Sequence, residues 1–93
     1  MKILGFHYDL VLREDKDDFG KMDIMNGTMF IDTQASEQIQ QSTVLHEALH
    51  ALDTHLSLRL GHNRIRLLEA GLFALLRDNG VDLSPLLKGG KSG

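Results

Sequence analysis

The chain contains no cysteine and no tryptophan, and it has only one proline and one tyrosine. Without cysteine, the protein has no disulfide, no thiolate zinc site and no cysteine nucleophile. This absence fits a reducing compartment, and the amino terminus lacks the apolar core of a signal peptide, so we expect a cytoplasmic protein. No run of apolar residues is long enough to cross a bilayer, so we expect no membrane partner.

Neither sign of charge dominates, because the chain has ten basic and thirteen acidic residues and a formal net charge of −3. The basic residues are scattered, whereas a nucleic-acid-binding surface needs them gathered into a patch, so we expect no nucleic-acid partner. With 93 residues, of which 42% are hydrophobic, the chain can form one domain with a thin core. We expect this domain over 1–87 and a flexible tail over 88–93.

The first third of the chain carries strand signals. Residues 2–12 are rich in aliphatic and aromatic residues that alternate with polar ones, which predicts one strand. Asn26-Gly27 lies between two short apolar segments, 22–25 and 28–32, and predicts a hairpin with a type I′ turn. The charged segment 13–18 is expected to be a surface loop.

The second half carries helix signals. Ser36 followed by Glu37 is typical of a helix start, and the helical period over 43–57 places four leucines on one stripe: Leu45, Leu49, Leu52 and Leu56. A second helix is expected over 64–78, with Asn63 as N-cap and Asn79-Gly80 as its end. Pro85 follows in a segment that can add one more turn. We therefore predict an α+β fold in which about three strands pack on two antiparallel helices.

The first predicted helix contains His46-Glu47-Ala48-Leu49-His50, an HExxH pattern. Histidines four residues apart lie on one face of a helix, about 6 Å from each other, so both imidazoles can bind one ion. Glu47 points about 100° away from the pair, near the open position of that ion, where a carboxylate can take a proton from water. The pattern is typical of zinc peptidases, with His46 and His50 as ligands and Glu47 as base.

Random placement would give this pattern in about 1% of chains of this composition, as two surface histidines of an amphipathic helix. Glu69 argues against such a coincidence, because it lies within an apolar stripe of the second predicted helix, where a carboxylate needs a positive partner. In an antiparallel helix pair, Glu69 and His50 both lie about 10 Å from the connection. We therefore predict one zinc ion bound by His46, His50 and Glu69, with the fourth position open, as in catalytic sites.

Other polar residues leave alternatives open. Asp53, one turn after the HExxH pattern, is an alternative ligand, an acceptor for a histidine ring, or an ordinary surface residue. His62, in the predicted interhelical turn, is a more distant alternative ligand, and His55 is expected at the surface. His7 and Tyr8 alternate along the first strand, so one of them can face the site and stabilise an oxyanion, although core or surface roles are commoner for both.

Residues 19–79 resemble the zinc-peptidase domains of the ImmA/IrrE type, in particular the short versions carried by bacteriophages. The resemblance rests on Phe19-Gly20, on the strand ending Phe30-Ile31-Asp32, on the block 42–53 around the HExxH pattern, and on the segments 68–72 and 76–79. It implies a minimal zincin-like fold, in which the active-site helix packs on a small sheet and an extended substrate pairs with the edge strand, here 28–32.

The same resemblance implies that His46 and His50 hold zinc, that Glu47 is the general base, and that a carboxylate on the next helix, which Glu69 can supply, is the third ligand. The expected activity is hydrolysis of a peptide bond in a specific protein substrate, in a bacterial or phage-infected cell. The alternative is a catalytically silent, zinc-stabilised module that binds and regulates a protein partner. A third reading is an adaptor made of a metal-free helical hairpin.

Overall fold

The fold is known from a computed structural model that describes residues 1–88 and 91–92. Within these residues, six short strands, two helices and one 3₁₀ turn follow one another: β1 (Lys2–Ile3), β2 (Phe6–His7), β3 (Asp9–Arg13), β4 (Gly20–Asp23), β5 (Thr28–Asp32), α1 (Glu37–Leu56), α2 (Gly61–Asp78), η1 (Ser84–Leu87) and β6 (Lys91–Ser92). The predicted α+β class is confirmed. Half of the predicted tail over 88–93, namely 89, 90 and 93, lies outside the described residues, and the other half consists of Lys88 and β6.

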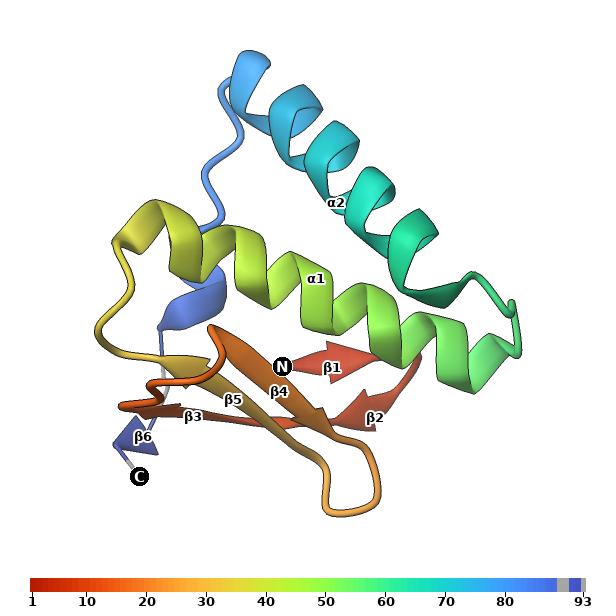
Figure 1. The fold of residues 1–93 in the computed structure, drawn as a ribbon, viewed down its shortest axis with the longest axis horizontal. Helices are drawn as coiled ribbons and strands as arrows, with labels where there is room; N and C mark the ends of the chain where they lie inside the picture. The colour runs from red at the N-terminus through yellow and green to blue at the C-terminus, as the bar shows by residue number, and fades with distance from the viewer. Residues whose placement is uncertain (89–90, 93) are drawn as a thin grey trace.

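The main sheet has the order β4-β5-β3-β6, and β1 and β2 form a separate antiparallel pair. The central strands β3 and β5 are parallel, with Leu10 opposite Met29, whereas β4 is antiparallel to β5. Figure 1 shows α1 lying across one face of this sheet and α2 running back from the end of α1 and diverging from it. The two helices are therefore closest near their connection and open away from it.

The core lies between the sheet and α1. Leu10, Met29 and Ile31 point toward the helix from β3 and β5, and Val44 and Ala51 meet them from α1. Small residues at this contact let the helix approach the sheet closely. The predicted leucine stripe is only partly correct, because Leu49 is buried but Leu56 is exposed. The residues that α1 contributes to the core cluster are Val44 and Ala51, with Ala48 and Leu52 packed against it.

The amino-terminal segment was predicted as one strand, and this is wrong. Leu4 and Gly5 both have positive φ, +52° and +82°, and the chain turns there, so β1 pairs back on β2. Only β3 continues into the main sheet. Glycine adopts this left-handed conformation without strain, and its presence beside Leu4 makes the turn possible.

The hairpin between β4 and β5 is present, but its turn is not type I′. The last strand pair is Asp23 with Thr28, so the loop has four residues, and of its Asn26-Gly27 pair only Gly27 has positive φ. The carboxylate of Asp23 accepts hydrogen bonds from the backbone and side-chain amides of Asn26 at 3.2 and 2.9 Å. These bonds fix the longer loop in place of the two-residue turn.

The strand at the edge of the sheet is also different from the predicted one. Residues 28–32 were expected at the edge, but β5 lies inside the sheet between β4 and β3. Within the described residues, the strand that borders α1 and has one unpaired side is β4. The parallel pairing of β3 and β5 explains the difference. These strands are neighbours in the sheet but have β4 between them in the sequence, and hairpin patterns indicate pairing only between consecutive strands.

The helix boundaries follow local capping. Ser36 is the N-cap of α1 and accepts a hydrogen bond from the amide of Ile39, as expected. The second helix begins earlier than predicted, at Gly61 rather than 64, and has no side-chain cap, so Asn63 is not its N-cap. It ends at Asp78, before Asn79-Gly80, as predicted. No helix of the described chain is both long enough and apolar enough to cross a lipid bilayer.

Gly20 permits a close contact between the edge strand β4 and α1. A Cβ at this position would collide with the methyl group of Thr43 and lie 3.0 Å from the carbonyl oxygen of Phe30. We expect Gly20→Ala to lower the free energy of unfolding by about 1–3 kcal/mol, because side chain and backbone must both shift. Gly71→Ala is the matched control: nothing lies near its Cβ, and alanine in a helix is favoured by about 1 kcal/mol. Urea unfolding of both variants measures the change in the free energy of unfolding. Equal stability of Gly20→Ala and wild type would show that the contact between Gly20 and Thr43 leaves room for a methyl group.

Candidate metal centre

Three histidines from both helices meet at one side of α1. His46 and His50 come from consecutive turns of α1, and His62 comes from the first turn of α2. One ring nitrogen of each lies within 4.8 Å of the others, so the three could hold a metal ion. The rings pack edge to face, with centroids 4.7 Å apart for His46 and His50 and 4.9 Å apart for His50 and His62. The HExxH spacing thus places both of its histidines where the sequence predicted, and α2 adds a third.

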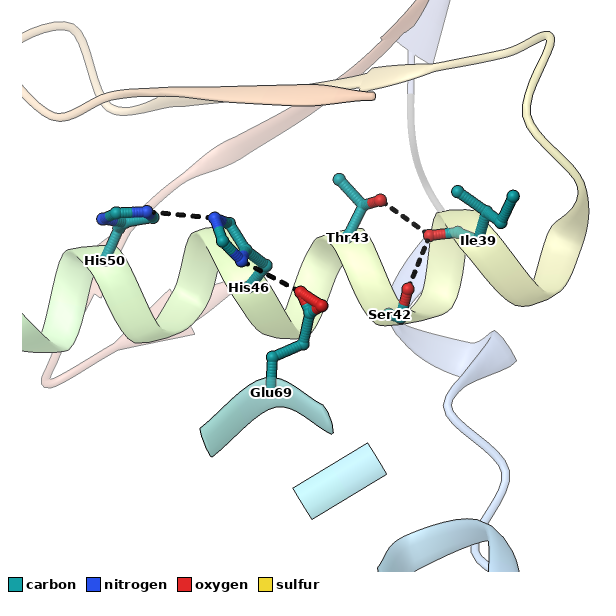
Figure 2. A network of polar contacts seen from close by, with 6 residues as sticks. All are labelled: Ile39, Ser42, Thr43, His46, His50 and Glu69. Carbon is teal, nitrogen blue, oxygen red and sulfur yellow. Dashed lines mark hydrogen bonds and ion pairs between the residues drawn. The ribbon is translucent and has the colours of Figure 1, made fainter. Parts of the chain in front are cut away.

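Glu69 contacts this cluster through His46. Its Oε1 lies 2.9 Å from Nδ1 of His46, and the Nε2 atoms of His46 and His50 lie 3.0 Å apart. Figure 2 shows Glu69 approaching from α2 while His46 and His50 stand on one side of α1. A carboxylate on Nδ1 holds the ring in the tautomer whose Nε2 is a free acceptor, which is the arrangement commonly found behind a metal-binding histidine.

The two Nε2 atoms have the spacing that a shared ion requires. Ligand nitrogens about 2.0–2.1 Å from a tetrahedral zinc ion are about 3.3 Å from each other. The observed 3.0 Å therefore needs only a small opening of the pair. Imidazole nitrogens bind zinc, copper, iron and nickel in preference to magnesium or calcium. The imidazole ligands at this site therefore fit zinc or a first-row transition-metal ion.

Glu47 lies on the side of α1 that faces the sheet, and only 7% of its surface is exposed. Even so, it lines the same cleft as the histidines. Burial raises the pKa of Glu47 to about 7, and the nearby carboxylates of Asp18 and Glu69 add to this shift. A carboxyl group with a pKa near neutrality can both accept and return a proton at physiological pH, which is what a general base and acid must do.

The raised pKa makes a prediction about the metal-free protein. A carboxyl group whose pKa is 4.5 when unfolded and about 7 when folded destabilises the fold as the pH rises between these values. Glu47→Gln removes this titration, so the variant should gain stability over wild type between pH 5 and pH 8. Solvent in the cleft screens the charge, and we expect a relative gain of about 2 kcal/mol. Urea unfolding in chelator at both pH values measures it; a pH-independent difference would contradict the assignment.

Burial also lowers the pKa of His50, and the neighbouring His46 and His62 lower it further, whereas Asp53 opposes the shift. A depressed pKa keeps the imidazole neutral near pH 7. The neutral form is the one that binds a metal.

The histidines and Glu47 line a cleft of about 810 Å³ between β4, α1 and α2. Edge-strand residues form one wall, and α2 contributes His62, Arg66 and Glu69 to the other. Arg66 makes no ion pair within the described residues. The cleft is large enough for several residues of an extended peptide. Within the described residues, the cluster of side chains that could hold a metal ion is the group His46, His50 and His62.

The remaining candidates have other partners. Asp53 accepts a hydrogen bond from the amide of Leu60 at 3.1 Å and so fixes the connection between the helices. Tyr8 is buried, its hydroxyl bonds to Nε2 of His55 at 2.5 Å, and Phe6 stacks on the same ring. His7 is exposed and pairs with Asp9 at 3.1 Å. Neither His7 nor Tyr8 is among the residues that line the cleft.

His62 was predicted only as a distant alternative ligand, and Arg66 was not predicted as a site residue, yet both line the cleft. The signal was present in the spacing, because residues 62, 66 and 69 follow the i, i+4, i+7 pattern of one helix face. Glu69 was predicted to lie on that face. A predicted helix that began at Gly61 rather than at 64 would have placed His62 on the same face.

No family model, no curated protein and no solved structure matches the chain. The site therefore has to be interpreted from its own geometry and chemistry.

Proposed function

We propose that the protein is a zinc-dependent metallopeptidase that hydrolyses a peptide bond of a specific protein substrate. The observation that carries the proposal is the joint placement of His46, Glu47 and His50: two imidazole nitrogens 3.0 Å apart, beside a buried carboxyl group with a pKa near 7, at the wall of one cleft. Carboxyl groups with a raised pKa that line a cleft are concentrated at catalytic sites, which supports catalysis over metal binding alone.

Zinc held by these histidines would supply a Lewis acid that polarises the peptide carbonyl and acidifies water. Glu47 would take a proton from the attacking water molecule and deliver it to the leaving amine. Glu69 would hold the tautomer of His46 through Nδ1 and stabilise positive charge on the ring. The narrow approach of β4 to α1 at Gly20 keeps Glu47 largely out of bulk water, which maintains its raised pKa.

The contacts favour His62 over Glu69 as the third ligand. His62 belongs to the group of nitrogens that lie within 4.8 Å of one another, whereas Glu69 sits behind the ring of His46. Direct ligation by Glu69, as the sequence analysis predicted, would require its carboxylate to leave Nδ1 of His46. Both arrangements keep a position open for water and substrate.

Zinc titration of two variants distinguishes these arrangements. If His62 is a ligand, His62→Ala should weaken zinc binding at least about 100-fold, and Glu69→Ala should weaken it about 10–100-fold, as loss of an orienting partner does. Glu69→Gln should restore most of the loss, because an amide oxygen still accepts from Nδ1 of His46. The opposite result, a small effect of His62→Ala and no rescue by Glu69→Gln, would identify Glu69 as the ligand.

The test of the function itself is zinc-dependent cleavage. Zinc-loaded protein is incubated with a library of unstructured peptides, and the products are identified by mass spectrometry. We expect cleavage that chelator stops and added zinc restores. Absence of any cleaved peptide, from protein that binds zinc, would contradict the proposal.

A further inference from the structure

The cleft is lined by two kinds of side chain. Histidines and charged side chains surround the candidate metal site, which we call the metal end. Phe19 and Ile39, at what we call the apolar end, are large apolar residues that are 55% and 37% exposed, whereas the other large apolar lining residues, Met22 and Ile24, are half-buried. Exposed apolar side chains are unremarkable when scattered, but two that border one cleft beside a catalytic group are positioned to be covered by a ligand.

Close packing brings these two residues to the same level of α1. Gly20 fits against Thr43 and Glu47, and Phe19 directly precedes it. Ile39 lies one turn before Thr43, whose hydroxyl donates to the carbonyl of Ile39 at 2.7 Å. Figure 2 shows Ile39, Thr43, His46 and His50 along one side of α1, so the apolar end and the metal end belong to one continuous wall.

The separation of the two ends can be expressed in residues of an extended peptide. Ile39 and His46 are seven residues apart on a helix, which corresponds to about 10 Å. An extended chain advances about 3.3 Å per residue, so about three residues span this length. Within the described residues, β4 pairs only with β5, which leaves its other side available to such a chain.

The direction of that chain follows from the direction of β4. In Figure 1, β4 runs in the same sense as α1, from the amino-terminal end of the helix toward its carboxyl-terminal end. Ile39 lies near the first of these ends, and His50 is nearer the second. Antiparallel pairing is the more stable kind per residue. A peptide antiparallel to β4 would therefore have its carboxyl-terminal part at Phe19 and Ile39.

We propose that Phe19 and Ile39 form a binding site for a bulky aliphatic side chain of an extended peptide substrate, about three residues to the carboxyl-terminal side of the hydrolysed bond. This inference rests on the proposed function, since the hydrolysed bond is counted from the metal site. Such a binding site would make the protein selective for substrates with an apolar residue about three positions after the hydrolysed bond.

Peptides that begin with a hydroxamate test this without a known substrate, because the hydroxamate binds the zinc ion and the peptide extends from it. The set is HONH–CO–CH₂–CO– followed by three glycines, or by the same tripeptide with leucine at the first, second or third position. On zinc-loaded wild type we expect leucine at the second or third position to improve affinity about tenfold over glycine. Phe19→Ser and Ile39→Ser should each remove most of this gain.

Two controls separate this inference from the proposed function. Acetohydroxamate reports the open metal position alone and should bind wild type, Phe19→Ser and Ile39→Ser equally. Leu67→Ser removes an apolar side chain that is 73% exposed on α2 and is not among the cleft residues, so it should keep the full leucine gain.

The outcomes are distinct. Binding of acetohydroxamate with no gain from leucine, or with a gain that both serine variants retain, overturns the apolar site and leaves the proposed function standing. Failure of acetohydroxamate to bind zinc-loaded protein overturns the proposed function and the inference with it.

Discussion

Glu47→Gln should reduce peptide hydrolysis by about 100- to 10,000-fold, the range expected when a general base is lost, while zinc stays bound. Glutamine has nearly the shape of glutamate but does not take a proton from water. The substitution also removes a buried carboxyl group rather than a metal-binding nitrogen, so neither fold nor zinc site should suffer. Cleavage rates and zinc content of the same preparation measure both effects.

Glu37→Gln is the matched control for this experiment. It makes the same chemical change on the same helix, in its exposed first turn and ten residues before Glu47, and it should leave hydrolysis unchanged. The result also separates the two zinc-dependent readings. If the Glu47→Gln protein keeps its full biological effect, the enzyme reading fails and the zinc-stabilised binding module takes its place.

Removing zinc should lower the melting temperature by about 15–30 °C. A ligand present at 1,000 times its dissociation constant stabilises the fold by about 4 kcal/mol. Each kcal/mol shifts the melting temperature of a domain of this size by about 4–8 °C. The effect is large because the core is thin, and because the ion would join α2 to α1 at the place where only Ile65 of α2 is fully buried.

Thermal unfolding with and without chelator measures this stabilisation. His46→Ala/His50→Ala should melt at the same temperature in both conditions, because it has lost its paired nitrogens. His7→Ala removes an exposed histidine that pairs only locally with Asp9, and it should respond to chelator as wild type does. Identical melting of wild type in both conditions would favour the metal-free adaptor.

The parts of the fold that depend on local sequence were predictable. The start of α1 follows from Ser36, whose side chain caps the amide of Ile39, and the end of α2 follows from Asn79-Gly80. The paired placement of His46 and His50 follows from helix geometry alone. Each of these features is decided within a few residues of the chain, where propensity and spacing are informative.

The parts that depend on distant contacts were not predictable in the same way. The position of β5 inside the sheet results from its parallel pairing with β3, although β4 lies between these two strands in the sequence. The left-handed conformation of Leu4 is uncommon for a leucine and is set by the turn it shares with Gly5. Hairpin and strand patterns carry no information about either.

The role of Glu69 shows the same limit within the site. Its place in an apolar stripe correctly indicated a partner on α1, and the structure supplies one in His46. Which atom it contacts depends on how the helices cross, and this crossing involves contacts distant from Glu69 in sequence, such as the hydrogen bond from Leu60 to Asp53 in the connection. Spacing along the chain could bring Glu69 to the histidines but could not choose between ligation and a hydrogen bond to Nδ1.

If His46 and His50 hold a zinc ion, metal analysis of the purified protein will detect it. Protein purified without a histidine tag and without chelator is analysed by plasma mass spectrometry, together with His46→Ala/His50→Ala. We predict about one zinc per wild-type chain and none in the variant. A folded wild-type protein that contains no zinc and takes none up on dialysis would contradict the account, and the HExxH pattern would then be a coincidence of sequence.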